Sequence, residues 1–425
     1  MKQIYAVLDI GSATIKLLVG ETVSANINIL FTKKMASHGI RKGIIEDVDA
    51  VAADIRKIVD EASAELGAPI NAVALTLPSR GAHIYQGDGI TKVNSDNDRI
   101  GVDDIIRTLK LSRRFALDKT EEIVSVVPVM YYLDTRRMDT IPLGMKTASL
   151  KVESMMITLK KKLFYSYLMA IEKAGLDLLD VTINAYSSAL EAFDAACLQD
   201  GAILIDVGFD ATSVALFEGG YLKYLAQVPV GGYDLTKAVA LAWMIDMATA
   251  EKYKVKYGTC EDAVGEEDVI HTTKYGNDIK NYTQYDLSSL MQKAVNELME
   301  VIKTKIDVIH DGRDYEIVIV GGGAELPGFE RIASARLGTK VTCYRPQTIG
   351  GRDMALTSCL GMMYYLDDRK ELNGEDRVSM ILPELSNTIG VRLKGLTKNK
   401  EEKKKKEDDS DGRIKKIVNS FFTEE

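Results

Sequence analysis

Residues 4–20 read IYAVLDIGSATIKLLVG, and the rest of the chain can be interpreted from this stretch. Two apolar, β-prone runs flank a short turn of Gly11, Ser12 and Ala13. Such a turn aims successive backbone N–H groups at one open point, which suits a phosphate group. Asp9 ends the first strand, where its carboxylate is placed to hold Mg²⁺ through water. For this stretch alone, a plain β-hairpin is the alternative interpretation.

The same pattern returns at residues 203–217, which read ILIDVGFDATSVALF. An apolar strand again leads to an Asp, one apolar residue and a Gly, here Asp206, Val207 and Gly208. Two copies of one unit this far apart favour two similar domains. Each domain is expected to present an Asp-bearing turn to a shared cleft.

Two further turns consist mainly of glycine, and each can bring the backbone close to a ligand. The first enters a helix expected from residue 234, whose free N–H groups favour contact with an anion or a ribose. The second follows an apolar strand at residues 317–320, and its backbone can lie flat against a planar ligand or its ribose. The glycines of these turns are Gly231, Gly232, Gly321, Gly322 and Gly323.

Four motifs carry a resemblance to a known superfamily: residues 9–16 (DIGSATIK), 206–208 (DVG), 230–236 (VGGYDLT) and 321–328 (GGGAELPG). They resemble the phosphate and adenosine motifs of actin, Hsp70 and the sugar kinases. Their order and spacing resemble most the FtsA family of bacterial actin-like cell division proteins. The resemblance covers nearly the whole chain.

The resemblance implies an α/β fold of the actin-like (ribonuclease H-like, duplicated) class. Two domains would enclose a nucleotide site in their cleft, with an inserted α+β subdomain and a C-terminal amphipathic helix. The implied cofactors are ATP and Mg²⁺, with Asp9 and Asp206 at the metal. The residues implied to bind the nucleotide are Asp9, Gly11, Ser12, Ala13, Thr14, Lys16, Asp206, Gly208, Thr212, Gly231, Gly232, Glu251, Lys254, Gly321, Gly322, Gly323 and Glu325.

Two of these assignments concern the adenosine. In the family a Glu and a nearby Lys flank it, so the resemblance places Glu251 at the ribose hydroxyls and Lys254, one helical turn on, as its partner. For Lys254 the alternative is a solvated charge pair at helical spacing.

The chain departs from the catalytically active members of the superfamily at two places. Many of those carry a Glu just before the helix that crosses between the domains, and it orients the attacking water. Asn184 or Ala185 stands there, and neither can act as a base at neutral pH. In the second phosphate turn, Asp210 adds a negative charge beside the phosphates, and Ala211 lacks a hydroxyl unless Thr212 supplies one. Phosphoryl transfer depends mostly on positioning and charge neutralisation, so we expect a protein that binds ATP as a structural and switching ligand and is at most a slow ATPase.

Length and composition limit the possible classes of protein. The 425 residues exceed one ordinary core and suit two domains. The net charge of −8 argues against a nucleic-acid binder, which would show a basic face. The four cysteines are scattered without a C-x-x-C pair, which favours reduced residues of a cytosolic protein over disulfides or zinc ligands. We expect no signal peptide, and no run approaches the ~20 apolar residues that span a bilayer.

The apolar periodicities predict the order of elements. Helices are expected at residues 47–66, 102–115, 164–174, 185–197, 286–310, 329–337 and 353–365. Strands are expected at residues 26–35, 73–78, 123–132, 150–159, 180–184 and 340–344. Residues 259–285 read as a polar surface excursion, and the globule is expected to end near residue 366.

The expected domains follow from these elements. The first domain comprises residues 1–80 and 163–199, and the second comprises residues 200–366, with an outer subdomain at 233–311. Residues 81–162 form an α+β insert. In the FtsA family this subdomain replaces the small lobe of actin and contacts the polymer and partners; a merely structural insertion is the alternative. The small-residue face of the 185–197 helix allows close approach of a neighbour, and the resemblance makes it the crossing helix.

The long helix at residues 286–310 resembles the outer helix that docks the C-terminal peptide of FtsZ. Lys293, Lys303 and Lys305 would meet the acidic, apolar tail of that peptide. Helices of this kind are common in α/β proteins, so the pattern alone is of low specificity.

Residues 367–411 are expected to form a charged, flexible tether. Residues 412–425 read as an amphipathic membrane-targeting helix, because apolar side chains recur at i, i+3, i+4, i+7 and i+8 and cations lie outside that stripe. A helix that docks on its own globule or on a partner is the alternative. The residues expected at the membrane are Arg413, Ile414, Lys415, Lys416, Ile417, Val418, Phe421 and Phe422.

The resemblance therefore predicts a protein that binds ATP, polymerises, anchors FtsZ filaments to the cytoplasmic face of the membrane at the division septum and recruits later division proteins. Its expected partners are the FtsZ C-terminal peptide, further copies of itself, anionic lipid and those later proteins, with no nucleic acid. One alternative is an actin-like pilus-assembly scaffold of the PilM type, which lacks a tether with a lipid helix. Another is a divergent sugar or metabolite kinase, which would need a general-base Asp and a polar sugar pocket. An Hsp70-type chaperone would need a peptide-binding domain, for which too few residues remain.

Overall fold

The computed structural model describes residues 3–23, 26–94, 98–134, 136–262, 268–275, 278–309, 311–338, 341–373 and 378–380. Most of the predicted tether, from residue 381 on, lies outside the described residues. So does the predicted membrane helix with Arg413, Ile414, Lys415, Lys416, Ile417, Val418, Phe421 and Phe422. Among the described residues, no helix has the length and apolar character needed to cross a membrane.

The first half of the chain is built around a five-stranded sheet in the order β11-β6-β1-β2-β3. An antiparallel meander of three strands comes first: β1 (Gln3–Ile10), β2 (Thr14–Val23) and β3 (Asn26–Ala36). β6 (Ala72–Leu77) and β11 (Asp177–Ile183) extend the sheet in parallel with β1. β1 and β6 are buried at nearly every position, which explains why they read as continuous apolar runs.

The second half repeats this sheet in the order β14-β13-β12-β17-β18. β12 (Ala202–Val207), β13 (Thr212–Glu218) and β14 (Tyr221–Val228) form the meander. β17 (Glu316–Val320) and β18 (Val341–Cys343) continue it in parallel with β12. The duplication inferred from the two Asp-x-Gly turns therefore extends over both sheets.

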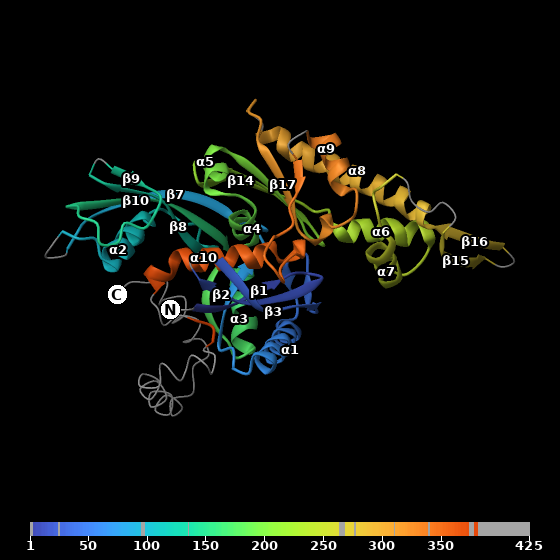
Figure 1. The fold of residues 1–425 in the computed structure, drawn as a ribbon, viewed down its shortest axis with the longest axis horizontal. Helices are drawn as coiled ribbons and strands as arrows, with labels where there is room; N and C mark the ends of the chain where they lie inside the picture. Colours follow the sequence, from blue (N-terminus) through green and yellow to red (C-terminus); the bar gives the residue numbers. More distant parts are fainter. Residues whose placement is uncertain are drawn as a thin grey trace.

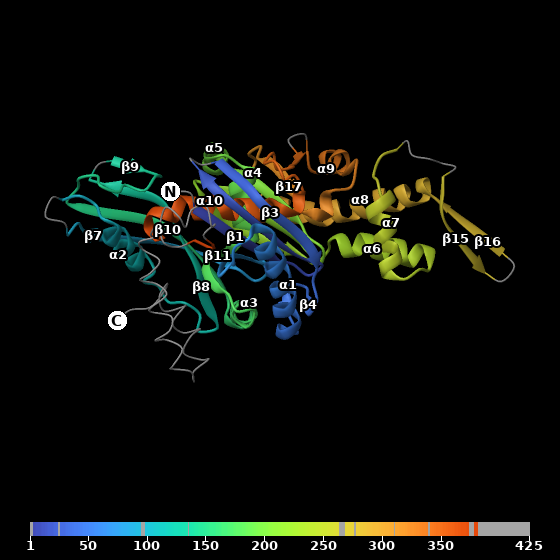
Figure 2. The same cartoon turned by 60° about the horizontal axis from the view of Figure 1, so that its bottom comes forward.

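Helices cover the sheets and connect them (Figure 1). α1 (Val48–Leu66) begins where the Asp47 carboxylate accepts hydrogen bonds from two backbone N–H groups, and it ends at Gly67 in the left-handed conformation. α3 (Lys161–Lys173) packs beside α1. α4 (Asn184–Ala192) and α10 (Thr357–Asn373) lie side by side across the middle of the molecule in Figures 1 and 2.

The contact between α4 and α10 is close enough to require a residue without a side chain. A Cβ at Gly361 of α10 would lie 1.6 Å from the carbonyl oxygen of Ser187 in α4. The close approach expected for this helix is present, and Gly361 of α10 makes it possible.

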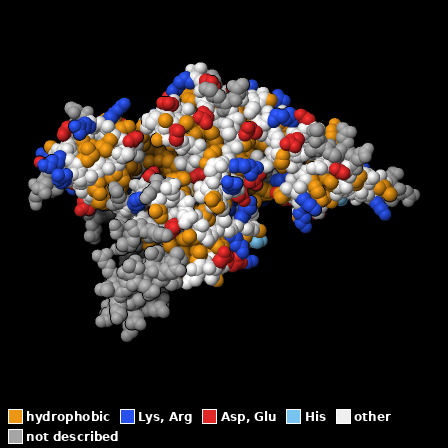
Figure 3. Space-filling view, viewed as in Figure 1, with side chains coloured by type: hydrophobic (Ala, Val, Ile, Leu, Met, Phe, Trp, Pro, Cys, Tyr) orange, Lys and Arg blue, Asp and Glu red, His pale blue; other side chains and the backbone are white. Residues whose placement is uncertain are grey.

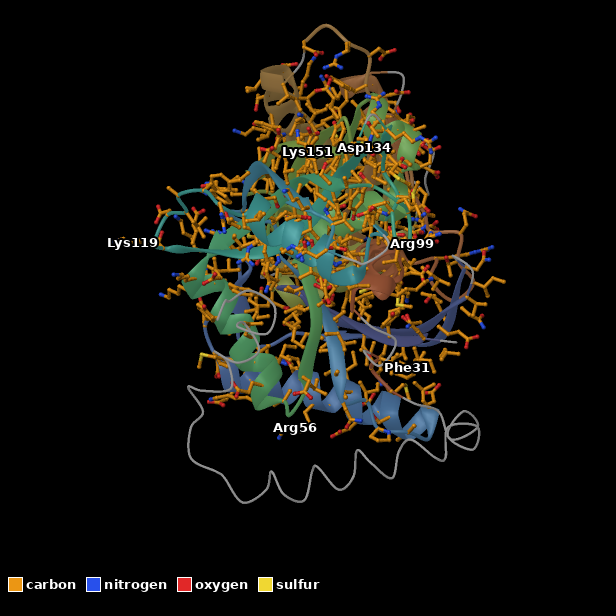
Figure 4. All side chains as sticks on the ribbon, turned by 90° about the vertical axis from the view of Figure 1, so that its left-hand side faces the viewer. Phe31, Arg56, Arg99, Lys119, Asp134 and Lys151 are labelled. Carbon is orange, nitrogen blue, oxygen red and sulfur yellow. The ribbon has the colours of Figure 1, made fainter. Side chains whose placement is uncertain are left out.

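The insert forms an antiparallel sheet in the order β7-β10-β8-β9 at one end of the molecule (Figure 1). Its strands are β7 (His83–Lys92), β8 (Glu121–Leu133), β9 (Arg136–Met138) and β10 (Ser149–Lys160). α2 (Val102–Ser112) packs on β7 and β10, and Figure 4 looks onto this end, where Arg99, Lys119, Asp134 and Lys151 are labelled. Arg369 of α10 ties the insert to the body, because its guanidinium donates to Val126 O of β8 at 2.9 Å and pairs with Asp180 of β11 at 3.4 Å.

Between β14 and β17 the chain forms an outer unit at the opposite end of the molecule (Figures 1 and 2). It contains α6 (Gly232–Trp243), α7 (Met247–Tyr257), β15 (Val269–Tyr275), β16 (Asp278–Thr283) and α8 (Gln284–Ile309). η1 (Gly322–Ala324), α9 (Phe329–Leu337) and η2 (Met354–Leu356) follow β17 along the chain.

The structure differs from the sequence predictions at four places. The helix predicted at residues 185–197 is two helices, α4 and α5 (Ala195–Asp200), because Phe193 is extended and Asp194 caps α5. Residues 259–285, predicted as a polar surface excursion, contain the β15–β16 hairpin, for which no strand was predicted. The helix predicted at residues 102–115 ends earlier, at Ser112.

The fourth difference concerns the end of the globule. Residues 367–373, predicted as the start of the tether, belong to α10. Ser379 then contacts the first sheet: its N–H donates to Ile4 O at 2.9 Å, its hydroxyl accepts from Ala6 N at 2.7 Å, and its carbonyl accepts from Asn71 N at 3.1 Å. Met380 is buried. The folded part of the chain therefore reaches at least residue 380.

Candidate functional site

A cavity of about 410 Å³ lies between the two sheets, at the carboxyl ends of β1 and β12. Cavities of this size are typical of small-molecule and cofactor sites. The structure brings most of the predicted nucleotide residues together here. Those that line the cavity are Asp9, Gly11, Ser12, Ala13, Thr14, Lys16, Asp206, Gly208, Gly232, Glu251, Lys254, Gly321, Gly322, Gly323 and Glu325.

The two Asp-x-Gly turns have the same backbone geometry. In the first turn the Gly11 N–H donates to Thr14 O at 3.0 Å, and in the second the Gly208 N–H donates to Ala211 O at 3.0 Å. A Cβ at Gly208 would lie 2.8 Å from that same Ala211 oxygen, so the second turn depends on glycine. The repeat read from the sequence is thus a repeat of hydrogen bonding.

Asp9 forms an ion pair with Lys16 in the cavity. Strand register pairs Asp9 with Lys16, and Lys16 Nζ lies 3.2 Å from Asp9 Oδ2. Burial is the largest single influence and would lower the pKa of Lys16, but the charge and hydrogen bond of Asp9 and the charges of Cys359 and Asp206 together outweigh it, so the pKa is raised. Ser358, at the start of α10, also donates to Asp9 Oδ2 at 2.5 Å. Lys16 is therefore a fixed cation beside the first turn.

The ionised form of Asp206 is less well stabilised than that of Asp9, which pairs with Lys16. Asn184 Nδ2 donates to Asp206 Oδ2 at 3.3 Å. Burial, and secondly the charge of Asp9, raise the pKa of Asp206 to about 6. A Cβ at Gly321 (φ 92°) would lie 2.4 Å from Asp206 Oδ1, so only glycine fits beside this carboxylate. The site is thus short of positive charge near Asp206.

Asn184 occupies the place where a catalytic base was sought in the sequence. Its Oδ1 accepts hydrogen bonds from the backbone N–H of Ser79, at 3.0 Å, and from the Ser79 hydroxyl. Its Nδ2 donates to Asp206, so the amide is fixed between the two sheets. An amide in this position offers no proton acceptor comparable to a carboxylate.

Lys254 is buried, so the solvated charge pair considered as an alternative is wrong. Its ammonium donates to Gly232 O at 3.0 Å and to Thr236 Oγ1 at 2.9 Å, and it pairs with Glu251 at 2.8 Å. These contacts use its three donors. The side chain of Glu251 is 37% exposed at the cavity and stays accessible to a ligand.

Two predicted residues do not line the cavity. The Thr212 hydroxyl is buried and donates to Val230 O at 2.8 Å, so it cannot replace the hydroxyl that Ala211 lacks; Ser213, next along the strand, reaches the cavity instead. Gly231 packs on the second turn, because a Cβ there would lie 2.5 Å from Gly208 O. Gly231 therefore shapes the turn and does not line the cavity.

Several lining residues have no counterpart in the sequence predictions. Lys34 of β3 pairs with Asp353, before η2, at 2.5 Å, and the Glu325 carboxylate accepts from Met354 N at 3.3 Å. Burial, and then the charge of Asp353, raise the pKa of Glu325. Figure 3, which has the view of Figure 1, shows basic and acidic side chains gathered in the middle of the molecule, between the halves built on the two sheets. The remaining unpredicted cavity residues with polar side chains are Lys42, Arg80, Ser188, Ser213, Gln227, Thr357 and Ser358.

Comparisons with known proteins identify two families along the chain. The model of "Cell division protein FtsA" matches residues 203–361, and that of the "SHS2 domain inserted in FTSA" matches residues 81–158. The cell division protein FtsA of Bacillus subtilis (strain 168) is 26% identical over 385 residues, which covers 90% of this chain and 87% of that protein.

Solved structures show the same fold at low identity. A protein of the PilM-PilN type IV pilus biogenesis complex is 15% identical with a TM-score of 0.58, over 85% of this chain and 98% of that one. MreB5 of Spiroplasma citri bound to ADP is 12% identical with a TM-score of 0.52, over 88% of this chain and 99% of that one. With the duplicated sheets, these likenesses confirm the actin-like α/β fold class.

Proposed function

Because this chain belongs to the FtsA family of actin-like cell division proteins, we propose that it binds ATP with Mg²⁺ in the cleft and polymerises. It anchors FtsZ filaments to the cytoplasmic membrane at the division site and recruits later division proteins there. The domain boundaries given above are part of this proposal, with the start of the tether moved beyond residue 380.

One observation carries the nucleotide part of this proposal. Two equivalent turns, each preceded by an aspartate, face one cavity that also holds the buried cation Lys16. Backbone N–H groups and a fixed ammonium are the groups that bind phosphate. Glu251 at the cavity would accept from the ribose hydroxyls.

The residues also fit Mg²⁺. Magnesium in nucleotide sites usually keeps several waters and uses one or two carboxylates together with the phosphates. Asp9 and Asp206 supply two carboxylates; burial, and secondly the charge of Asp9, raise the pKa of Asp206, so a cation between the two carboxylates would stabilise the ionised form of Asp206. Mg²⁺ bound there would neutralise phosphate charge.

Calorimetric titration of the full chain with ATP and Mg²⁺ tests the site. We expect one nucleotide per chain, and weaker binding in Glu251→Gln. Glu297→Gln, on the exposed face of α8, makes the same chemical change away from the cavity and should bind like the wild type. A wild-type chain that binds no nucleotide would refute the proposal.

Hydrolysis is proposed to be slow. Asn184 fills the place of a water-orienting carboxylate, and Asp210 lines the cavity as an additional negative charge. Both features weaken transition-state stabilisation more than ground-state binding. Rapid steady-state phosphate release by the purified, lipid-free protein would contradict this part of the proposal.

The membrane part rests on the sequence of residues 412–425, which lie outside the described residues. A single short helix binds anionic lipid weakly, at ~1 kcal/mol per cation near the surface plus its apolar area. Polymerisation would multiply the anchors and strengthen attachment through avidity. Removal of residues 413–425 should release the protein from phosphatidylglycerol-containing liposomes in a sedimentation assay while ATP binding persists.

A matched pair of substitutions separates the apolar stripe from overall charge. Val418→Asp and Asn419→Asp each add one negative charge at neighbouring positions, but only Val418 belongs to the stripe. We expect Val418→Asp to abolish sedimentation with liposomes and Asn419→Asp to reduce it modestly. Equal losses in both variants would show that the helix does not insert an apolar face.

The FtsZ part of the proposal concerns α8. Lys293 and Lys303 are exposed on this helix, and Val301 and Val308 are exposed apolar side chains on it, at 37% and 71%. A surface of this kind complements an acidic, apolar peptide. Lys303→Glu should weaken binding of an FtsZ tail peptide in fluorescence anisotropy, whereas Lys57→Glu on α1 should not.

A further inference from the structure

The hairpin of β4 (Ile40–Arg41) and β5 (Ile44–Ile45) lies at the cavity and has an unusual turn. Its two turn residues, Lys42 and Gly43, both have positive φ, 51° and 70°. This is the geometry of a two-residue type I′ hairpin. Lysine is uncommon in this conformation, and such outliers persist where surrounding contacts hold them.

Three side chains of the first lobe fix this turn above the first phosphate turn. The Gly43 N–H donates to Ser12 Oγ at 3.0 Å, and the Tyr167 hydroxyl donates to Gly43 O at 3.2 Å. The guanidinium of Arg80 donates to Lys42 O at 2.8 Å. The turn is therefore positioned by residues that surround the phosphate-binding backbone.

The second lobe reaches the same turn through Asp210. The Lys42 N–H, which makes no ladder hydrogen bond in the hairpin, donates to Asp210 Oδ2 at 2.7 Å. Asp210 lies in the second phosphate turn, so one hydrogen bond joins the two lobes at the phosphate end of the cleft. We call Lys42, Arg80 and Asp210 the clasp.

The clasp carries charges that the nucleotide motifs do not include. Lys42, Arg80 and Asp210 all line the cavity that contains Asp9 and Lys16. Within the described part of the chain, neither Lys42 nor Arg80 forms an ion pair with a carboxylate. The cavity therefore has two cationic side chains, Lys42 and Arg80, beside the Asp210 carboxylate, which accepts a hydrogen bond from the Lys42 N–H.

We propose that the clasp distinguishes a nucleoside triphosphate from a diphosphate in this cleft, with Lys42 and Arg80 attracting the terminal phosphate and Asp210 opposing it. The inference rests on the proposed nucleotide binding. A terminal phosphate adds negative charge at the end of the nucleotide that meets the two turns. Lys42 and Arg80 attract the charge of the terminal phosphate. The Asp210 carboxylate repels that charge, and it also holds the Lys42 turn in place by accepting the Lys42 N–H.

The variants can be chosen so that the turn itself survives. Lys42→Gly removes the ammonium and keeps the N–H, and glycine adopts φ 51° without strain. Asp210→Asn removes the negative charge and keeps an oxygen that can accept from Lys42 N. Arg80→Gln removes the guanidinium charge.

Arg56→Gln is the matched control for Arg80→Gln. The guanidinium of Arg56 also donates to a backbone carbonyl, that of Lys173, but it lies on α1 outside the cavity lining (Figure 4). Loss of a charge and of one hydrogen bond to a carbonyl is thus common to both variants. Only Arg80→Gln changes the cavity.

The measurement is the dissociation constant of the full chain for ATP and for ADP, each with Mg²⁺, at about 0.1 M salt, where exposed charges separated by more than ~10 Å are screened. We expect Lys42→Gly and Arg80→Gln each to lower the preference for ATP over ADP about fivefold, a typical effect for one partly exposed charge pair. Asp210→Asn should raise that preference, and Arg56→Gln should leave it unchanged.

The outcomes separate this inference from the function it rests on. If the wild type binds both nucleotides but Lys42→Gly and Arg80→Gln weaken ATP and ADP equally, the clasp does not read the terminal phosphate and the inference is overturned. A fall in ATP preference in Asp210→Asn would also overturn it. If the wild type binds neither nucleotide, the proposed function and the inference fail together.

Discussion

Replacement of Asp206 by Asn should stabilise the folded chain at neutral pH while it weakens the proposed binding of Mg²⁺ and nucleotide. Burial and the nearby charge of Asp9 raise the pKa of Asp206 from 3.8 to about 6. Above pH 6 the folded chain therefore holds an ionised carboxylate in an unfavourable place. Asparagine removes that charge and keeps a carbonyl oxygen that can accept from Asn184 Nδ2.

The magnitude follows from proton linkage. A difference of about two in pKa corresponds to ~3 kcal/mol between the protonation states. Between pH 4 and 6 the folded chain binds a proton that the unfolded chain has lost, so the contribution of Asp206 to stability falls as pH rises through this window. Below pH 4 both states are protonated, and above pH 6 the cost stays constant.

Urea denaturation of the wild type and Asp206→Asn at several pH values measures this difference. We expect the variant to be more stable by ~3 kcal/mol at pH 7.5, by ~1.5 kcal/mol at pH 5, and by little at pH 4. Asp60→Asn on the exposed face of α1 is the control and should leave stability unchanged. A variant no more stable than the wild type at pH 7.5, or a gain that does not shrink on acidification, would refute the reasoning.

Three further predictions concern the stability of the folded chain. Asp9→Asn leaves the buried ammonium of Lys16 without its carboxylate and should cost ~3–5 kcal/mol in urea denaturation, opposite in sign to the change at Asp206. Ser379→Ala deprives the buried Ala6 N–H of its acceptor; it should cost ~1–3 kcal/mol, and the amide of Ala6 should exchange faster with solvent. Gly361→Ala forces a methyl against the backbone of α4 and should lower stability by ~1–3 kcal/mol or more, measured as a fall in the denaturation midpoint.

The sequence predicted the parts of the fold that depend on local periodicity. The helix predicted at residues 47–66 is α1 (Val48–Leu66), and α9 has the predicted bounds. The two Asp-x-Gly turns were recognised because their hydrogen bonds require small residues at fixed offsets. Features that depend on neighbouring residues, such as these turns, can be predicted from a single stretch of sequence.

The unpredicted features depend on contacts between distant segments. Lys42 and Asp210 are 168 positions apart and meet only because the second lobe folds over the β4–β5 turn. Ser358 reaches Asp9 across 349 positions. The β15–β16 hairpin lies in a polar stretch with exposed apolar side chains at Val269 and Ile279, so it lacks the buried alternation by which a strand is recognised.

The difference between local patterns and contacts between distant segments also explains why the end of the globule was predicted too early, near residue 366. The charged residues after 366 suggest a solvent-exposed segment, but Arg369 lies inside the structure, where it pairs with Asp180 and donates to the backbone carbonyl of Val126. A buried charge is retained when its partners are in place, and those partners come from β11 and β8, far away in sequence. Polarity alone therefore cannot mark the end of a folded domain.

These contacts give α10 a role that its sequence does not reveal. Its first turn carries Ser358, which donates to Asp9 in the cavity, and its fourth turn carries Arg369, which holds the insert through Val126. Between them Gly361 packs directly against the backbone of α4, so the helix cannot slide along its neighbour without steric conflict. Close-packed elements of this kind move as rigid bodies. Any rearrangement of the cleft that displaces the start of α10 must therefore also move the insert, at the far end of the same helix.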